Sequence, residues 1–353
     1  MELYVLSKDL VTLLVIDDYI SVLWVERYCE TGDFEIELPI DYINNPYVIK
    51  NNRIFCSDSD RVMIIEQINP AKSEDNDKLV IKGTSIEKEL QQRVTRQTTY
   101  CEQYVESFCM ELVDAELIRP TDQSRVYPNL EFVSNTSFQV YLSDQYPPSS
   151  VYDIVQSACS SKDGGFKITL NIGTRKLQMM VYKGVYRTYD QYAYPYVVFS
   201  EAFDNVTDHS FLESVKEHKN VAMVISDDPT IQTAVIWDED YDEPTGNLRR
   251  EMVVDATDLT RDIPDSPPLT DGEFLAIMYQ RGLNALKERV PVYILEGEFD
   301  MSSSFKYGED FFLGDVVQCG FYGKTSKARL IEIVRSVSAE GSKILGSFDF
   351  NIL

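Results

Sequence analysis

The sequence predicts an α+β fold that is predominantly β, in which two small antiparallel β-barrels flank an α+β insertion. Strand-rich stretches lie at both ends of the 353-residue chain, and each contains a Gly-Asp turn, Gly32-Asp33 near the start and Gly314-Asp315 near the end. Between them, runs of helical periodicity follow Ser or Thr residues of the kind that cap helices. A chain of this length buries a sizeable core and accommodates two or three domains.

Residues 1–90 are expected to form the first barrel. Phe34, Ile36 and Leu38 alternate with Glu35 and Glu37. This period of two is typical of a strand with one buried face. Turn signals separate several such runs, as they do in small antiparallel barrels. The predicted strands are 13–16, 22–28, 34–40, 61–68 and 79–82.

Residues 91–195 are expected to form the α+β insertion. Helix starts are predicted where a Ser or Thr is followed three residues later by an acid, because the two side chains satisfy free backbone N–H groups. Apolar residues at helical spacing follow the second and third of these patterns, and strands are predicted over 166–172 and 176–182. The four patterns are Thr84 to Glu87, Thr99 to Glu102, Ser150 to Asp153 and Thr270 to Glu273.

The rest of the chain is expected to complete the second barrel. Residues 196–257 carry strands of that barrel or of a sheet region, residues 258–291 form a linker and an amphipathic helix, and residues 292–353 supply the closing strands. Pro264, Pro267 and Pro268 indicate the linker. The predicted strands are 197–199, 221–225, 233–237, 251–254, 293–299, 315–321, 329–334 and 343–350.

The charge balance argues against adhesive binding to nucleic acid or to membranes. The chain has 58 acidic and 33 basic residues, which gives a net charge of −25. A field of that sign repels phosphate backbones and anionic lipids, although it does not prevent DNA from passing through a channel. The apolar run from Leu10 to Ile16 is far shorter than the roughly 20 residues of a membrane helix, and no export signal is expected.

The six cysteines predict thiols and not a metal or redox motif. They lie far apart in the sequence, without a Cys-x-x-Cys pair. Such spacing is typical of reduced, mostly buried thiols in a protein made in a cytoplasm.

No constellation of residues predicts catalysis, a cofactor or an enzyme. His209 and His218 are nine residues apart, which would place them on opposite faces of a helix. Neither a serine-nucleophile elbow nor a Gly-rich phosphate loop is present. Asp238, Asp240 and Asp242 form a weak calcium candidate. We favour a solvated hairpin tip there, because a calcium loop needs Gly at the sixth position and Glu at the twelfth, which are here Glu243 and Arg249.

An aromatic run over 182–196 contains Tyr186, Tyr189, Tyr192 and Tyr194. Rings in such a run suit a sugar-binding platform, and they equally suit contact with another protein or core packing. We favour protein contact or core packing, and keep a carbohydrate-binding module for host surface recognition as the alternative function. A carboxylate-based hydrolase is a third and weaker interpretation, because 58 acids produce close pairs by chance.

Several stretches resemble phage tail hub proteins, which include the baseplate hubs of contractile tails and the tail-associated proteins of long non-contractile tails. Residues 1–6, 21–28 and 32–36 resemble the N-terminal barrel of that family. Further similar stretches are 197–205, 219–221, 313–317 and 328–333. The residues that carry the barrel motifs under this resemblance are Trp24, Gly32, Phe34, Glu35, Gly314, Asp315 and Arg329.

The resemblance implies a non-enzymatic homotrimeric ring with two barrels in each subunit. Such a ring is pseudo-hexameric, so it joins a sixfold tail tube to a threefold tip and lets DNA pass as cargo. The implied partners are the tail tube or a distal tail protein ring on one side, and a spike, fibre or tail-tip protein on the other. The implied location is the virion tail, after assembly in the host bacterial cytoplasm, with no membrane binding by this chain.

Overall fold

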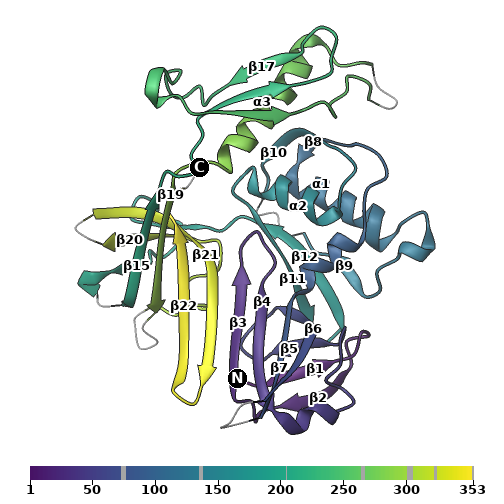
Figure 1. Ribbon diagram of the computed structural model, residues 1–353, viewed down its shortest axis with the longest axis vertical. Coiled ribbons are helices and arrows are strands. Elements are labelled where there is room, and N and C mark those ends of the chain that lie inside the picture. The colour runs from purple at the N-terminus through teal and green to yellow at the C-terminus, as the bar shows by residue number, and fades with distance from the viewer. Residues whose placement is uncertain are drawn as a thin grey trace.

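The computed structural model describes residues 1–72, 77–134, 138–203, 205–263, 267–299, 305–321 and 324–351. The predicted α+β, predominantly β class is confirmed. Figure 1 shows a long curved sheet, a group of helices beside it, and a smaller sheet with one helix above them. In the described part of the chain no helix is long and apolar enough to cross a membrane.

The N-terminal residues form one half of the long sheet, with strand order β3-β4-β7-β6-β5-β1-β2. The predicted alternation in β4 is confirmed, since Phe34, Ile36 and Leu38 are buried in a core that Trp24 shares. The strands are β1 (Leu3–Leu6), β2 (Thr12–Ile16), β3 (Ser21–Arg27), β4 (Asp33–Pro39), β5 (Arg53–Cys56), β6 (Val62–Ala71) and β7 (Lys78–Ser85).

The C-terminal residues form the other half of the same sheet, with order β15-β19-β22-β21 and with β13, β14 and β20 beside β21. This half has its own core, which includes Phe199, Phe311 and Phe348. The strands are β13 (Tyr186–Arg187), β14 (Val198–Ser200), β15 (Val206–Ser214), β19 (Val292–Phe299), β20 (Val316–Phe321), β21 (Lys324–Ser338) and β22 (Gly341–Asp349).

Strand β21 joins the two ends of the chain. Its first residues pair with β20, and its later residues pair antiparallel with β3, from Glu332↔Arg27 to Val337↔Val22. Figure 1 shows the yellow β21 beside the purple β3. In the described residues the main path of paired strands is open, from β15 to β2. The closure of each half into a barrel therefore stays a prediction.

The α+β insertion covers one side of this junction, and its core continues into the N-terminal half through residues such as Leu10, Val62 and Ile64. The predicted helix at Ser150 is confirmed, since the Ser150 hydroxyl accepts from the Asp153 N–H at 3.1 Å. The helices are α1 (Val105–Val113) and α2 (Val151–Ser160), and the strands are β8 (Thr99–Tyr104), β9 (Leu130–Phe132), β10 (Tyr141–Tyr146), β11 (Gly165–Asn171) and β12 (Lys176–Tyr182).

Two predicted helix starts are wrong. Thr84 lies in β7, and the 3₁₀ helix that follows has Ser85 at its N-cap while Glu87 is buried against Arg61. Thr99 and Glu102 lie in β8, because that segment pairs with β10, and α1 begins only at Val105. The short helical turns are η1 (Ile40–Asn44), η2 (Ile86–Gln92), η3 (Asp114–Ile118), η4 (Gln123–Arg125), η5 (Glu201–Phe203) and η6 (Gly246–Leu248).

Residues 215–291, here called the distal module, are inserted between β15 and β19, whose last paired residues are Ser214 and Val292. The module has a separate sheet of order β17-β16-β18 and a separate core beneath α3. Its strands are thus not paired with the β19–β22 sheet of the second half. The elements are β16 (Val221–Ile225), β17 (Thr233–Ile236), β18 (Glu251–Asp255) and α3 (Asp271–Lys287).

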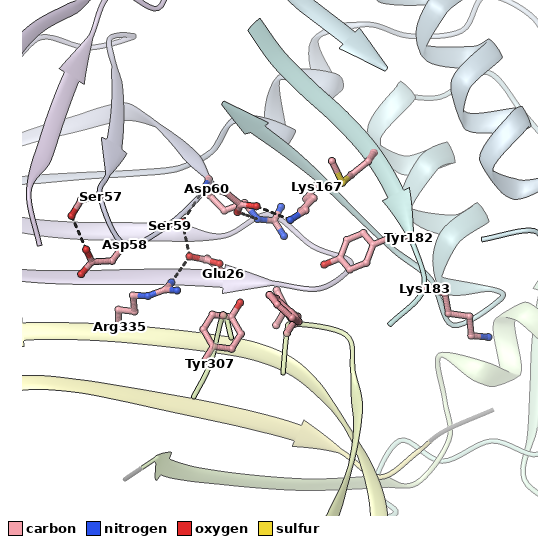
Figure 2. A pocket seen from close by; sticks show the side chains of 15 residues that line it. Glu26, Ser57, Asp58, Ser59, Asp60, Lys167, Tyr182, Lys183, Tyr307 and Arg335 are labelled. Atoms are coloured by element: carbon pink, nitrogen blue, oxygen red, sulfur yellow. Dashed lines mark hydrogen bonds and ion pairs between the residues drawn. The ribbon is translucent and has the colours of Figure 1, made fainter. Parts of the chain in front are cut away.

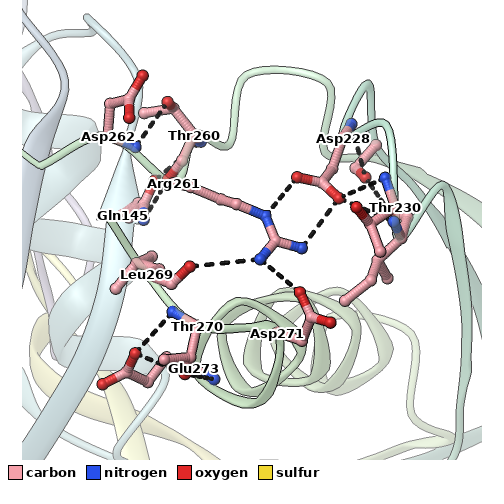
Figure 3. A network of polar contacts seen from close by, with 12 residues as sticks. Gln145, Asp228, Thr230, Thr260, Arg261, Asp262, Leu269, Thr270, Asp271 and Glu273 are labelled. Carbon is pink, nitrogen blue, oxygen red and sulfur yellow. Dashed lines mark hydrogen bonds and ion pairs between the residues drawn. The ribbon is translucent and has the colours of Figure 1, made fainter. Parts of the chain in front are cut away.

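The start of α3 is fixed by two linked sets of polar contacts (Figure 3). The predicted capping box at Thr270 and Glu273 is confirmed. Beside it, the Arg261 guanidinium donates to Asp228 and Asp271, and it lies 5.0 Å from the ring centroid of Phe274. The Arg261 hydrogen bond holds the pKa of Asp228 well below its usual range. Of the predicted linker prolines, Pro264 lies outside the described residues.

The distal module contacts the insertion through polar groups. Asn284 Nδ2 donates to Asp144 Oδ2 at 3.1 Å, and Arg281 Nη2 donates to the Gln145 carbonyl at 2.8 Å. Gln145 in turn donates to the Thr260 carbonyl at 3.2 Å. The buried cores of the two parts share no residue. The distal module is therefore connected to the rest of the chain by strands β15 and β19 and by these polar contacts with the insertion.

Stability is expected to depend on pH through Asp144. Burial raises and Arg281 lowers the pKa of this carboxyl, with a net rise to about 6. The Asp144 carboxyl therefore binds a proton more tightly in the folded protein than in the unfolded chain. This difference stabilises the folded protein at low pH, and the stabilisation is lost as pH rises through about 6. Between pH 5 and pH 7 the loss is about 1.4 kcal/mol. Urea unfolding of the wild type and of Asp144→Asn at pH 5 and pH 7 measures this loss of stability. If the free energy of unfolding depends on pH equally in the two proteins, Asp144 is not its cause.

Candidate functional site at the junction of three regions

A cavity of about 690 Å³ lies where the two halves of the long sheet meet the insertion. Figure 2 shows side chains from all three regions converging on it. β3 supplies Glu26, the insertion supplies Lys167 and Tyr182, and the C-terminal half supplies Tyr307 and Arg335. The walls therefore carry charges of both signs.

The central ion pair joins β3 to β21. Arg335 Nη1 donates to Glu26 Oε1, and the same oxygen accepts from the Ser59 hydroxyl at 2.7 Å. Glu26 is 4% exposed and Arg335 is 8% exposed, so water screens the pair weakly. The Arg335 guanidinium also lies 5.2 Å from the ring centroid of Tyr307. Burial lowers and Glu26 raises the pKa of Arg335, and the net change is a rise.

A second buried pair lies within the N-terminal half and accepts a hydrogen bond from the insertion. Arg61 Nη1 donates to Glu87 Oε1, which also accepts from the backbone N–H of Ile168 on β11 at 2.8 Å. Beside it, Lys167 Nζ donates to Asp60 Oδ2 at 2.6 Å. Burial raises the pKa of Asp60, while Lys167 and Arg61 lower it, and the net change is downward.

Asp315 holds together the start of β20 and the segment before β13. Its Oδ1 accepts from the Val185 N–H at 2.9 Å, and its Oδ2 accepts from Arg187 Nε at 2.6 Å and from the Phe312 N–H at 3.0 Å. Asp315 and Arg187 are both buried. The contact with Arg187 satisfies a buried donor that would otherwise be left unpaired.

Gly314 and Arg329 surround Tyr28, the residue that follows β3. Gly314 has φ of 96°, and a Cβ there would lie 2.2 Å from the Tyr28 ring. Arg329 Nη1 donates to the Gly314 carbonyl at 2.9 Å, and its guanidinium lies 5.6 Å from the Tyr28 ring centroid. The Tyr28 hydroxyl accepts from the Gly184 N–H at 3.1 Å. This cluster therefore ties the N-terminal strand to the C-terminal half and to the insertion.

The predicted barrel-motif residues divide into two groups. Gly314, Asp315 and Arg329 come together at the cluster just described. The other four lie on β3, on β4 or in the turn between them, in the N-terminal half. Trp24 and Phe34 pack with ring centroids 6.1 Å apart in the core, Gly32 lies where a Cβ would meet the Val25 carbonyl oxygen at 2.2 Å, and Glu35 forms an exposed ion pair with Lys82 at 2.6 Å.

Sequence reasoning missed the ion pairs of the cavity. Glu26 and Arg335 are 309 residues apart and Arg61 and Glu87 are 26 apart, so no local spacing links them. A signal was nevertheless present, because Glu26 follows the apolar run Val22 to Val25 and Arg335 follows Ile333 and Val334. A charge at a buried position of a strand needs a partner.

The weak calcium candidate is an exposed loop. Asp238 Oδ1 accepts from the Asp240 N–H at 3.1 Å, and Glu243 pairs with Arg249 at 2.6 Å. In the described ranges no group of three His, Cys, Asp or Glu residues is arranged to hold a metal. His209 packs against Phe321, and His218 Nδ1 lies 3.2 Å from the Arg289 carbonyl oxygen.

The tyrosine run lies on the surface. Tyr189, Tyr192 and Tyr194 are exposed, and Tyr192 is 100% exposed. Tyr189 packs on Tyr196 with ring centroids 5.2 Å apart. Core packing is therefore not the role of these three rings.

The sequence matches the family model described as Siphovirus ReqiPepy6 Gp37-like protein over residues 2–346. A search of curated proteins returns no match. Solved structures similar to this chain include a tail protein from Neisseria meningitidis MC58, at 11% identity and a TM-score of 0.60, covering 99% of this chain and 96% of that one.

Two prophage proteins have similar folds. The 43 kDa tail protein of prophage MuSo2 from Shewanella oneidensis is 9% identical with a TM-score of 0.60, covering 99% of this chain and 98% of that one. The prophage tail protein gp18 from Listeria monocytogenes EGD-e is 11% identical with a TM-score of 0.53, covering 100% of this chain and 96% of that one. At these identities the likeness shows the fold, and it agrees with the expected resemblance to phage tail proteins.

Proposed function

Since the chain belongs to the Siphovirus ReqiPepy6 Gp37-like protein family, we propose that it is the structural hub of a phage tail tip or of a related injection device. The observation that carries the proposal is the single sheet that joins both ends of the chain through β21 and β3. The buried pair of Glu26 and Arg335 fixes one half against the other. Such a subunit holds two similar strand-rich halves in a fixed orientation relative to each other.

The proposed assembly is a homotrimeric ring. Each half of the sheet would close into a small barrel, so three subunits would present six barrels and match a sixfold tail tube to a threefold tip. Closed point symmetry produces a finite ring, and closed barrels leave no free strand edge to misassemble. The proposed neighbours are the tail tube or a distal tail ring on one face, and a spike, fibre or tail-tip protein on the other.

The proposed hub carries DNA only as cargo and performs no catalysis. The net charge of −25 supports passage without adhesion, because an acidic channel repels phosphate. Glu26, Asp60, Arg61, Lys167 and Arg335 of the cavity each form an ion pair, which supports a structural role for them. The proposed location is the virion tail, after assembly in the host bacterial cytoplasm.

Light scattering across a range of concentrations tests the oligomeric state. The proposal predicts a mass three times the 40.5 kDa of one chain. A protein that remains monomeric at high concentration and in the presence of its tail partners would contradict it.

A carbohydrate-binding module is the alternative function, and the exposed tyrosines favour it. Tyr189 and Tyr196 are exposed and pack with their rings tilted by 55°, and Tyr192 of the same run is fully exposed. Aromatic rings of this kind bind the apolar faces of sugars. Glycan-array binding that is lost in Tyr189→Ala would support this function, and an absence of binding to any glycan would remove it.

A further inference from the structure

The sheet of the distal module is apolar on both of its faces. In β16, Ala222 and Val224 are buried in the core beneath α3, whereas Met223 and Ile225 alternate with them and are exposed. A sheet with one face in water normally alternates apolar with polar side chains. The second face of this sheet therefore has the composition of a covered surface.

The exposed apolar side chains form one continuous surface. Met223 is in register with Val235 on β17 and with Val253 on β18, so the three side chains lie side by side across the whole sheet. Met223 is 39% exposed, Val235 is 45% exposed and Val253 is 61% exposed. Ile225 extends this surface along β16. These four residues are here called the open face.

The open face lies on the side of the sheet away from the insertion. On the opposite side α3 packs so closely that a Cβ at Gly282 would lie 2.9 Å from side-chain atoms of Val224 and Ile236. Arg281 and Asn284 of the same helix contact β10 of the insertion. The helix α3 therefore lies between the sheet and the insertion (Figure 1).

The open face has the size that one helix covers. Three strands at their usual spacing span about 14 Å, and a helix with its side chains is about 10 Å wide. On the opposite face of the same three strands, α3 supplies the helical part of the core. Helices on both faces of a sheet are a standard layer arrangement. A second helix on the open face would complete such an arrangement.

Another copy of this chain is a poor source of that helix. In the described residues, α1 and α2 bury their apolar sides in the insertion core, and α3 buries its apolar side in the distal core. Each copy also has a net charge of −25, so two copies repel each other at long range. The helix is therefore expected from a different protein.

The charge of the distal module favours a basic helix. Residues 215–291 contain 16 acidic and 8 basic side chains. At the Ile225 end of the open face, Asp255 is in register with Ile225 and Asp227 follows β16, and both acids are exposed. A lysine or arginine of the partner would lie close to two carboxylates there.

The other end of the open face carries both signs of charge. Glu251 and Glu243 both pair with Arg249, at 2.5 Å and 2.6 Å. Arg250 is exposed, and its guanidinium donates to the Val215 carbonyl at 2.8 Å. The attraction for a basic helix therefore comes mainly from the Ile225 end.

We propose that the open face binds an amphipathic, basic helix of a neighbouring tail protein. The apolar side of that helix would cover Met223, Val235 and Val253, and its cations would lie toward Asp227 and Asp255. This proposal rests on the proposed hub for the presence of a neighbouring tail protein, and it adds the surface on which that neighbour would dock.

A designed peptide tests the proposal on the full-length protein. The probe is a helical peptide of leucine and lysine at amphipathic spacing, and its control has serine in place of every leucine and the same charge. Fluorescence anisotropy should show that the wild type binds the leucine peptide at least about tenfold more tightly than the serine peptide. Equal affinities would show attraction by charge alone and would overturn the proposal.

Glutamate substitutions locate the binding surface. Val253→Glu and Val235→Glu place a carboxylate within the open face, and each should weaken binding of the leucine peptide by at least about tenfold. Leu248→Glu, on an exposed side chain of the same module outside the open face, should bind as the wild type does. All three variants add the same charge, so a difference between them reports the lost apolar contact. Equal binding by all three would overturn the proposal.

The oligomeric state of the same variants separates the other occupant. We expect light scattering to give the same mass for Val253→Glu, Val235→Glu and the wild type. A smaller mass for both open-face variants would assign the open face to a second copy and would overturn the proposal. A wild type that never forms a trimer would contradict the hub, whereas loss of peptide binding specificity would contradict only the docking surface.

Discussion

Arg335→Met is expected to lower the free energy of unfolding by about 3–5 kcal/mol, the cost of leaving one member of a buried ion pair without its partner. Glu26 is 4% exposed, and its remaining recorded partner is the Ser59 hydroxyl at 2.7 Å. The variant also removes the guanidinium from the face of Tyr307. Urea unfolding at neutral pH measures the loss.

Two further variants control this experiment. Arg96→Met removes an exposed arginine that pairs with Asp122 at 3.3 Å, and should cost less than about 1 kcal/mol. The double variant Glu26→Leu with Arg335→Met should recover much of the loss, because apolar side chains often replace a buried ion pair without cost. If Arg335→Met is as stable as Arg96→Met, the pair does not fix β3 to β21.

Gly314→Ala is expected to cost about 3 kcal/mol or more, since two penalties add. The residue has φ of 96°, which a side chain rarely adopts, and the new Cβ would lie 2.2 Å from the Tyr28 ring. Tyr28 cannot move freely, because its hydroxyl accepts from the Gly184 N–H and Arg329 lies over its ring. Thermal unfolding provides the measurement.

Two other glycines separate the penalties. Gly341 has φ of 126° with nothing within 4 Å of the added Cβ, so Gly341→Ala reports the backbone strain alone. Gly272 lies in α3 with equally open space and no positive φ, so Gly272→Ala should be neutral or slightly stabilising. A Gly314→Ala variant that loses no more stability than Gly341→Ala would show that the contact with Tyr28 contributes nothing.

Sequence patterns correctly predicted the elements that depend on residues close together in the sequence. The alternation of Phe34 with Glu35 located β4, because one face of that strand is buried. The caps at Ser150 and Thr270 correctly predicted the starts of α2 and α3, because each hydroxyl accepts a hydrogen bond from a backbone N–H in the first turn of its own helix. The same pattern failed at Thr99, where pairing of β8 with β10 makes the segment a strand.

The junction could be predicted only in part. Gly314, Asp315 and Arg329 were singled out through a family resemblance, and the structure brings them into one cluster. The joining of the two ends of the chain rests on residues such as Arg27 and Glu332, whose pairing spans 305 positions. Neither periodicity nor spacing carries information about a contact of that separation. The distal module was not predicted as a separate unit, because the pattern of a strand does not indicate which sheet the strand joins.

Single-particle imaging of the assembled wild-type protein tests the central claim most directly. We expect a threefold ring with an open central channel, in which two strand-rich halves of each subunit alternate around six positions. Particles of any other symmetry, or a threefold particle in which the long sheets lie away from the ring, would contradict it.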